Sequence, residues 1–162
     1  MERKLLAVVA ADMVGFSRLV ENDETSILNR QKEYFKEIIK PQIEKFHGKI
    51  IKTTGDGFLA TFVSSLDAVE STTNIQKTIN LREKGQSNDK RIWFRIGINV
   101  GEVVLDDGDI FGSSVNIASR LESITDAGDI CITSDIFQNI KIEPQIPCFG
   151  ITFHPPTWTE PC

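Results

Sequence analysis

Two aspartates stand where the chain could bind a metal ion. Asp12 ends the apolar run 5–11, and Asp56 lies 44 residues later in a Gly-Asp-Gly turn. A carboxylate at the end of a buried strand is costly unless it is exposed or paired with a cation, and two neighbouring carboxylates raise each other's pKa unless a cation lies between them. A divalent metal removes both costs, and oxygen ligands of this kind favour Mg²⁺ together with substrate phosphates. The plainer interpretation is a helix cap and an ordinary turn residue.

A glycine-bearing turn follows Asp12 directly and contains Met13, Gly15, Phe16 and Ser17. Backbone N–H groups in such a turn can face a phosphate. Together with the acidic pair, the turn favours metal-assisted phosphate chemistry.

Asn116 and Arg120 lie four residues apart in a predicted helix, so they share one of its faces. The apolar side chains take up the rest of the helix surface: Val115, Ile117, Ala118, Leu121 and Ile124. We therefore expect Asn116 and Arg120 to point away from the core. On its own such a pair is usually a solvated face, but opposite a phosphate the guanidinium would stabilise developing negative charge.

Hydrophobic patterning predicts the elements that must position these residues. The run 5–11 is continuous, which is typical of a central strand covered on both faces. A long amphipathic helix is expected from Asn22 or Asp23 to Gly48, and Pro41 inside it predicts a kink or a break near Ile39 to Lys40. The remaining elements are a hairpin with strands 49–54 and 58–63, helices 66–82 and 115–124, and strands 92–100 and 129–133.

This order of elements is β-α-β-β-α-β with a helix and a strand added. It predicts an α+β sandwich of the ferredoxin-like or palm type, with helices packed on a mainly antiparallel sheet. A right-handed first crossover would then bring Asp12 and Asp56 together.

The composition fits one globular domain. The chain has 162 residues, of which 40% are hydrophobic and 25% charged, and its net charge of −5 has the wrong sign for broad nucleic-acid binding. Three cysteines without C-x-x-C spacing indicate neither a disulfide framework nor a zinc site, and the apolar runs are too short to span a membrane. We expect a cytoplasmic protein with no membrane contact. Residues 141–162, which hold five of the six prolines, are expected to form an irregular tail after a domain at 1–140.

Four motifs occur in a fixed order along the chain. They are ADMVGFS at 11–17, KTTGDGF at 52–58, RIGI at 95–98, and GDIFG at 108–112 running into VNIASRLE at 115–122. Together they resemble the class III nucleotide cyclases, specifically bacterial-type adenylate cyclase catalytic domains, over about residues 5–139. The resemblance implies a head-to-tail homodimer that converts ATP to 3′,5′-cyclic AMP and pyrophosphate at its subunit interface.

The resemblance also implies a role for each candidate residue. Asp12, Met13 and Asp56 match the metal-binding positions, which would hold two Mg²⁺ or Mn²⁺ ions per site. These ions would activate the ribose 3′-hydroxyl for attack on the α-phosphorus and neutralise the departing pyrophosphate. Asn116 and Arg120 would come from the opposite subunit, where Asn116 places the ribose and Arg120 stabilises charge at the α-phosphate.

Lys52 and Asp109 match the positions that select adenine in this family. Adenine presents an acceptor at N1 and a donor at N6, so one donor and one acceptor in register would bind it. Guanine reverses that pattern and would leave both groups unpaired. ATP is therefore expected as the substrate in preference to GTP, with substrate contacts also from Gly15, Phe16 and Ser17. Without the family match, a solvated lysine and a member of an acidic turn would be the simpler interpretations.

The chain departs from the family pattern at its end. Family domains usually finish with a β-hairpin whose lysine contacts the phosphates, and after Arg120 only Lys141 is available, in a segment that does not resemble that hairpin. Alternatives therefore stay open: a catalytically impaired nucleotide-binding or dimerisation module of the same fold, or a guanylate cyclase. A receiver domain phosphorylated at Asp12 and an RNA binder fit the sequence less well. Class III domains are usually attached to sensory or scaffold modules, and none is visible here.

Overall fold

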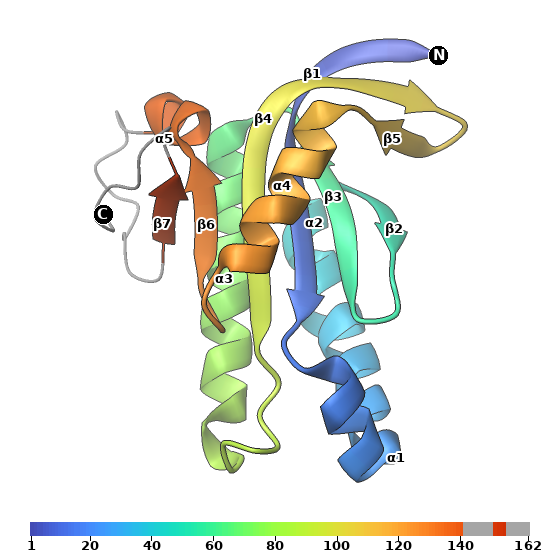
Figure 1. The fold of residues 1–162 in the computed structure, drawn as a ribbon, viewed down its shortest axis with the longest axis vertical. Coiled ribbons are helices and arrows are strands. Elements are labelled where there is room, and N and C mark those ends of the chain that lie inside the picture. The colour runs from blue at the N-terminus through green and yellow to red at the C-terminus, as the bar shows by residue number, and fades with distance from the viewer. Residues whose placement is uncertain (141–150, 155–162) are drawn as a thin grey trace.

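A seven-stranded sheet organises the domain, with the order β2-β3-β1-β4-β6-β7 and with β5 paired to β4 (Figure 1). The computed structural model describes residues 1–140 and 151–154. The strands are β1 Glu2–Met13, β2 Lys49–Thr53, β3 Gly57–Phe62, β4 Phe94–Asp106, β5 Asp109–Phe111, β6 Ile130–Thr133 and β7 Ile151–His154. Strands β1 to β5 pair antiparallel, whereas the β4–β6 and β6–β7 pairs are parallel. The predicted mainly antiparallel sheet is confirmed.

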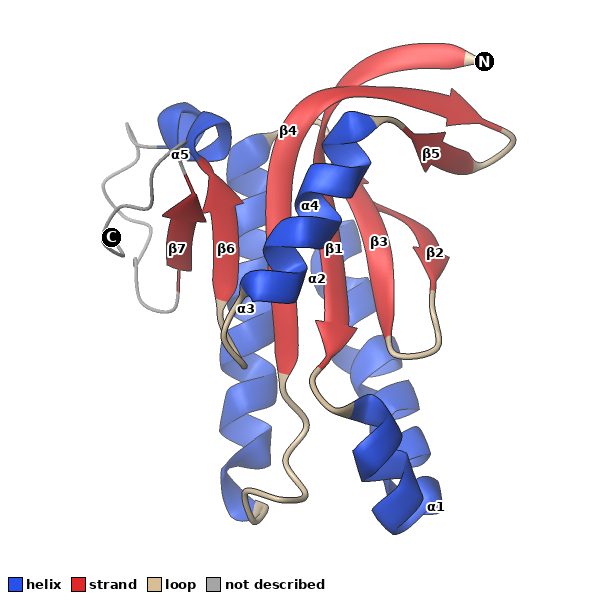
Figure 2. Ribbon diagram, viewed as in Figure 1, coloured by secondary structure: helices blue, strands red, loops and turns tan. Residues whose placement is uncertain are grey.

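Helices cover both faces of the sheet, as Figure 2 shows. The helical elements are α1 Phe16–Tyr34, the π-helical turn η1 Phe35–Ile39, α2 Lys40–Lys45, α3 Ser65–Arg82, the 3₁₀ turn η2 Glu83–Gly85, α4 Ser113–Ile124 and α5 Ser134–Ile140. Helix α4 lies alone in front of the sheet in Figure 1, with α2 and α3 behind it. The predicted α+β sandwich is confirmed.

Strand β1 occupies the centre of this arrangement, between β3 and β4. Its side chains alternate between two cores, because successive residues of a strand point to opposite faces. Ala7, Val9 and Ala11 pack with α1, α2 and α3 side chains, whereas Val8 and Ala10 pack with Ala118 of α4 and its neighbours. This double burial explains why residues 6–11 are continuously apolar, whereas Leu5 at the start of the run is 70% exposed.

The first helix begins earlier than its sequence pattern indicated. Helix α1 starts at Phe16, but Asp23 has non-helical dihedral angles (φ −159°, ψ 76°) and its carboxylate accepts a hydrogen bond from the Ser26 amide at 3.2 Å. The predicted start at Asn22 or Asp23 is therefore wrong as the helix start, although it marks the point where the helix restarts after a kink. The first segment has helical spacing of its apolar residues Phe16, Leu19 and Val20, but it was missed because it spans only about two turns before the kink.

The kink or break expected near Ile39 to Lys40 coincides with a change of helix type. Residues Phe35–Ile39 form a π-helical turn, and Pro41 then lies in the first turn of α2, where its missing N–H breaks no helical hydrogen bond. The helix ends at Lys45, close to the expected stop at Gly48.

Two predicted boundaries need correction. Strand β4 runs on to Asp106, beyond the predicted end at Val100, because its second half pairs with β1 and β5 although the hydrophobic alternation has ended. The irregular tail expected at 141–162 contains strand β7 at Ile151–His154. The other residues of that tail, including Lys141, lie outside the described part of the chain. No helix among the described residues has the length and apolarity that crossing a bilayer requires.

Candidate functional site

The two aspartates converge as predicted. Asp12 lies opposite Gly57 in the β1–β3 pair, and the Met13 amide donates a 2.8 Å hydrogen bond to the Asp56 carbonyl oxygen. A Cβ on Gly57 would lie 1.8 Å from the Ala11 carbonyl oxygen, so this close backbone approach requires glycine. Residues 44 positions apart in sequence thus form one corner of the sheet.

Arg95 binds Asp12 directly, and the sequence analysis did not select it as a site residue. The two are register partners in the β1–β4 pair, and the guanidinium donates from Nε to Oδ1 at 3.2 Å and from Nη2 to Oδ2 at 3.1 Å. These hydrogen bonds raise the pKa of Arg95 above its ordinary value. Strand alternation placed Arg95 on the less buried face, but its partner depends on a register that the sequence does not reveal.

Glu122 of α4 completes the cluster and was also missed. Its Oε1 lies 3.3 Å from Arg95 Nη2 without making a hydrogen bond of good geometry, and its side chain is only 10% exposed. Burial raises the pKa of Glu122 to about 8, with further contributions in the same direction from Asp12 and Asp56 and an opposing one from Arg95. Helical spacing could have indicated that Glu122 faces the sheet, since it lies four residues after the buried Ala118.

The donor set of this corner fits a divalent cation. Asp12, Asp56 and Glu122 supply three carboxyl groups and Arg95 one cation, so the corner is electrostatically suited to added positive charge. No three acidic, histidine or cysteine side chains in the described residues lie close enough to hold an ion together. A cation here would therefore complete its shell with water, backbone oxygens and substrate phosphates. The Met13 side chain is buried, so only its backbone carbonyl oxygen could take part.

Lys52 and Asp109 meet on the side of the molecule that carries β2 and β5. Lys52 Nζ lies 2.9 Å from Asp109 Oδ2, although 57 residues separate them. The hydrogen bond from Lys52 lowers the pKa of Asp109, and the Ile110 amide adds a second hydrogen bond to that carboxylate at 2.8 Å. Lys52 is the register partner of Leu59, which packs in the core beneath α4, so the pair belongs to the sheet face that carries Asp12.

The glycine-bearing turn lies between β1 and α1. Gly15 has a left-handed backbone conformation (φ 63°), and its carbonyl oxygen accepts the first helical hydrogen bond, from the Leu19 amide. The first turn of a helix leaves its amides without helical partners. Gly15 and Ser17 are exposed and Phe16 is half-buried. The amides of Phe16 and Ser17 are therefore available near the acidic corner.

Asn116 and Arg120 are both exposed on α4, as predicted. In the described part of the chain, neither side chain makes a hydrogen bond or ion pair, and neither contacts the Asp12–Asp56 corner of its own chain. Arg120 lines a hollow of about 500 Å³ on this outer face, together with Ile117, Leu121, Ser123 and Ile124. Ile117 and Ile124 were predicted to pack in the core, but they are 38% and 53% exposed, because α4 buries only a narrow stripe on the sheet.

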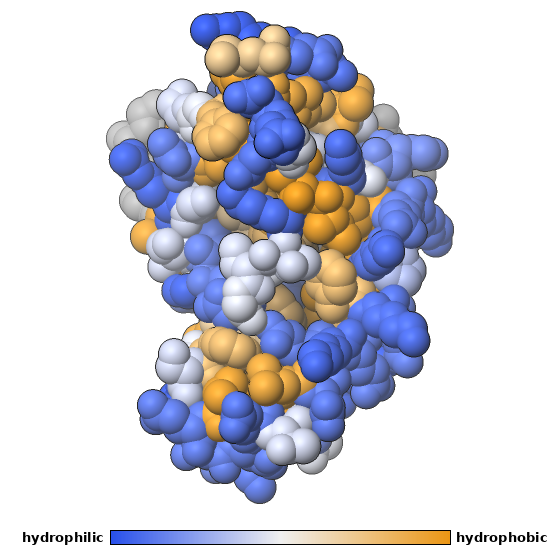
Figure 3. All heavy atoms as spheres, turned by 90° about the vertical axis from the view of Figure 1, so that its right-hand side faces the viewer, coloured by the Kyte–Doolittle hydropathy of each residue, from blue (hydrophilic) through white to orange (hydrophobic). Residues whose placement is uncertain are grey.

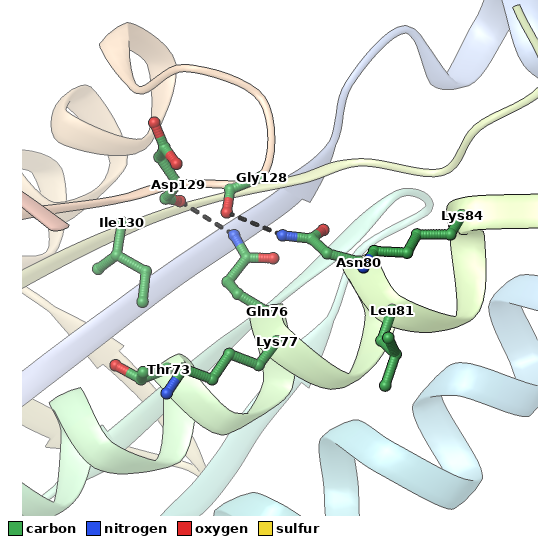
Figure 4. A pocket seen from close by; sticks show the side chains of 9 residues that line it. All are labelled: Thr73, Gln76, Lys77, Asn80, Leu81, Lys84, Gly128, Asp129 and Ile130. Carbon is green, nitrogen blue, oxygen red and sulfur yellow. Dashed lines mark hydrogen bonds between the residues drawn. The ribbon is translucent and has the colours of Figure 1, made fainter. Parts of the chain in front are cut away.

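A second hollow, of about 370 Å³, lies on the opposite side of the sheet, against α3 (Figure 4). Gln76 donates hydrogen bonds to the carbonyl oxygens of Phe94 and Asp129, and Asn80 donates to that of Gly128. These bonds tie α3 to the starts of β4 and β6. The hollow contains none of the predicted site residues.

The family model for the adenylate and guanylate cyclase catalytic domain matches residues 2–151. The chain belongs to this family. The cyclase domain is 46% identical to an adenylate/guanylate cyclase/hydrolase from Silicibacter pomeroyi of known crystal structure, with a TM-score of 0.84 over 91% of this chain and 85% of that one. The adenylyl cyclase CyaB from P. aeruginosa is 28% identical, with a TM-score of 0.77 over 88% and 83% of the two chains.

Longer relatives carry the same domain. A protein of Rhizobium meliloti (strain 1021), provisionally named adenylate cyclase 3, is 36% identical over 152 residues, which are 94% of this chain and 26% of the relative. An adenylate cyclase of Streptomyces coelicolor (strain ATCC BAA-471 / A3(2) / M145) is 34% identical over 119 residues, 74% of this chain and 30% of the relative. The cyclase domain thus spans between a quarter and a third of the length of these two relatives.

Proposed function

We propose that the cyclase domain converts ATP to 3′,5′-cyclic AMP and pyrophosphate at the interface of a homodimer. One observation carries the proposal: the two sets of site residues are separate within a single chain. Asp12 and Asp56 meet at one corner of the sheet, whereas Asn116 and Arg120 project from α4 without partners in the described residues. A head-to-tail dimer would bring the α4 of one copy to the acidic corner of the other.

The acidic corner would hold two divalent cations, Mg²⁺ or Mn²⁺, by analogy with the family. When bound, these ions supply the charge that neutralises the triphosphate and lowers the pKa of the ribose 3′-hydroxyl. Asp12 and Asp56 would hold them through carboxylate oxygens, and Met13 through its backbone carbonyl oxygen. The amides of Phe16 and Ser17, after Gly15, would donate hydrogen bonds to phosphate oxygens.

The α4 pair would act on the reacting centre. Negative charge builds on the α-phosphate oxygens as the 3′ oxygen attacks and pyrophosphate departs, and the Arg120 guanidinium is suited to stabilise it. Asn116, one turn earlier on the same face, would hydrogen-bond the ribose and align the 3′ oxygen with the phosphorus. Their exposure in the single chain is expected if their substrate is bound mainly by another copy.

The Lys52–Asp109 contact favours adenine over guanine. It places an N–H donor and a carboxylate acceptor within one hydrogen bond of each other, 2.9 Å apart. Lys52 could donate to adenine N1 while Asp109 accepts from the N6 amino group. Two solved guanylyl cyclase relatives at 25% identity carry nucleotides: a rhodopsin-guanylyl cyclase with converted specificity holds ATPαS, and that of Catenaria anguillulae holds GTP. These two relatives hold different bases, so the adenine preference proposed for this chain rests on its own Lys52 and Asp109.

Exposed apolar side chains around α4 and β5 support the dimer. Phe111, Ile117 and Ile124 are between 38% and 53% exposed. Figure 3 shows apolar patches set among polar side chains on the side of the molecule that bears β2 and β5. Such patches on a small domain commonly mark interfaces. Since longer relatives carry the domain as one part, a sensory or scaffold segment would supply its regulation.

The direct test is to incubate the purified domain with ATP and Mn²⁺, then with GTP, and to measure cyclic nucleotide and pyrophosphate. We expect cyclic AMP and pyrophosphate in equal amounts, abolished by EDTA, with GTP a poorer substrate. Calorimetric binding of ATP without turnover would instead identify an impaired nucleotide-binding module, and preferred turnover of GTP would identify a guanylate cyclase.

A further inference from the structure

The acidic corner and α4 of one chain are physically connected. Arg95 donates to Asp12 through Nε and Nη2, lies 3.3 Å from Glu122 of α4 through Nη2, and donates from Nη1 to the Ser123 carbonyl oxygen of α4 at 3.1 Å. One guanidinium therefore contacts both a strand carboxylate and the last turns of the helix.

The backbone of α4 touches the sheet at the same place. A Cβ on Gly97 would lie 2.3 Å from the Ala118 carbonyl oxygen and 2.5 Å from the Glu122 amide nitrogen, so helix and strand are in direct backbone contact. Gly97 follows Arg95 by two positions and therefore lies on the same face of β4. This contact fixes the backbone at Glu122, and the side chain, which is only 10% exposed, lies with its Oε1 3.3 Å from Arg95 Nη2.

We propose that Glu122 is a positioning residue that braces α4 against the Arg95–Asp12 pair, so that the two site halves of one chain are held as one unit. Glu122 lies two residues after Arg120 on the same helix. The inference rests on the proposed function, in which the Asp12 corner and Arg120 of one chain serve two different catalytic sites. The brace then couples the two sites of the dimer, because a shift of Asp12 and Arg95 in one site moves the Arg120 that serves the other.

Mixed dimers can test this coupling, because they separate the two halves. A "helix donor" carries Asp56→Ala and supplies only Asn116 and Arg120 to the working site. An "acid donor" carries Arg120→Ala and supplies only the acidic pair. Activity appears on mixing if the proposed function is correct, and Glu122 can then be changed in either chain separately.

We expect Glu122→Ala in the helix donor to lower kcat about tenfold with little change in KM for ATP, since it misplaces a group that acts in the transition state. Glu122→Gln in the same chain should restore most of the rate, because the amide keeps the contacts of the carboxyl group. Glu44→Ala, an exposed glutamate of α2, is the matched control and should leave kcat unchanged. If Glu122→Ala lowers kcat only when it is in the acid donor, Glu122 acts only on the acidic corner of its own chain. That result would overturn the proposed role of Glu122 in positioning α4.

Hydrogen exchange gives a readout without metal or nucleotide. Glu122→Ala and Arg95→Ala should each speed amide exchange in α4 about tenfold, because each removes a contact to a charged group, while exchange in α3 stays unchanged. Arg82→Ala, which breaks the ion pairs of α3 with Glu33 of α1 and Glu37 of η1, is the control and should leave α4 exchange unaltered. Unchanged α4 exchange in both brace variants would overturn the inference even if mixed dimers were active. Inactive mixed dimers with faster α4 exchange would overturn the proposed function but support the mechanical link.

Discussion

The acidic corner and the outer face of α4 lie on the same side of the sheet, yet they differ in whether their polar side chains have partners in their own chain. At the corner, Asp12, Arg95 and Glu122 contact one another and are at most about a quarter exposed. On the outer face, Asn116 and Arg120 are exposed and have no polar partner among the described residues. This contrast supports the proposed dimer, in which Asn116 and Arg120 of one chain would complete a site on the acidic corner of a second chain.

The largest expected effect on catalysis comes from removing a carboxylate at the acidic corner. Asp56→Ala should lower cyclic AMP formation about 100-fold or more, since metal-borne charge stabilisation is worth several kcal/mol. Circular dichroism and the melting temperature should show that the domain still folds, because the Met13–Asp56 contact uses backbone atoms only. Full activity in this variant would show that the corner does not hold the metal.

A change on the exposed outer face of α4 should weaken dimerisation. Ile124→Asp places a charge on an exposed apolar position of α4, so it should weaken the dimer about 10-fold or more while the monomer keeps its fold. Analytical ultracentrifugation across a concentration series measures the change, and Thr78→Asp on α3 serves as a control on the opposite side of the sheet. An unaltered dimerisation constant would place the interface elsewhere.

Substrate selection should change by a smaller factor. The paired change Lys52→Glu and Asp109→Lys reverses the donor and acceptor, so the ratio of kcat/KM for ATP over GTP should fall about 10-fold or more. Steady-state kinetics with both nucleotides provide the measurement. If the ratio stays constant while both rates drop, the pair supports the fold and does not read the base.

The smallest effect concerns stability. The folded-state pKa of Glu122 is raised from 4.5 to about 8, so between these values the folded protein binds more protons than the unfolded chain. The free energy of unfolding should therefore fall as pH rises through this window, by up to about 1.4 kcal/mol per pH unit. Asp12 and Asp56 oppose ionisation of Glu122 and Arg95 favours it.

Urea unfolding in EDTA at pH 5, 6, 7 and 8 measures this slope in the wild type and in Glu122→Gln. The variant should have the flatter profile, and subtracting the two profiles removes the contribution of Asp129, whose pKa burial also raises. Parallel profiles would mean that Glu122 is ionised like an exposed carboxylate.

Much of this architecture could be predicted from the sequence because it depends on local pattern. The continuous run 5–11 predicted a strand buried on both faces, and the motifs at 52–58 and 115–122 predicted where the acidic turn and the α4 pair would lie. The convergence of Asp12 with Asp56 followed from the order of the elements. Pairing between Lys52 and Asp109 followed only from the family resemblance.

The rest depends on contacts that no local pattern records. Arg95 and Glu122 were missed because their meeting requires both the β1–β4 register and the close approach of α4 at Gly97. Ile117 and Ile124 were assigned to the core because their spacing fits a buried stripe, whereas the chain alone leaves them exposed. An interface side chain and a core side chain have the same sequence signature, so the difference appears only in three dimensions.

Mixing two inactive chains is the sharpest test of whether each catalytic site is shared between two subunits. Asp56→Ala and Arg120→Ala each destroy one half of the site, and a mixed dimer contains one complete site built from both chains. Each variant alone should be inactive, and an equimolar mixture should regain about a quarter of wild-type cyclic AMP formation, since half of the dimers are mixed and each has one of two sites intact. No cyclic AMP formation by the mixture, although ultracentrifugation of differently labelled chains shows that mixed dimers are present, would contradict a shared catalytic site.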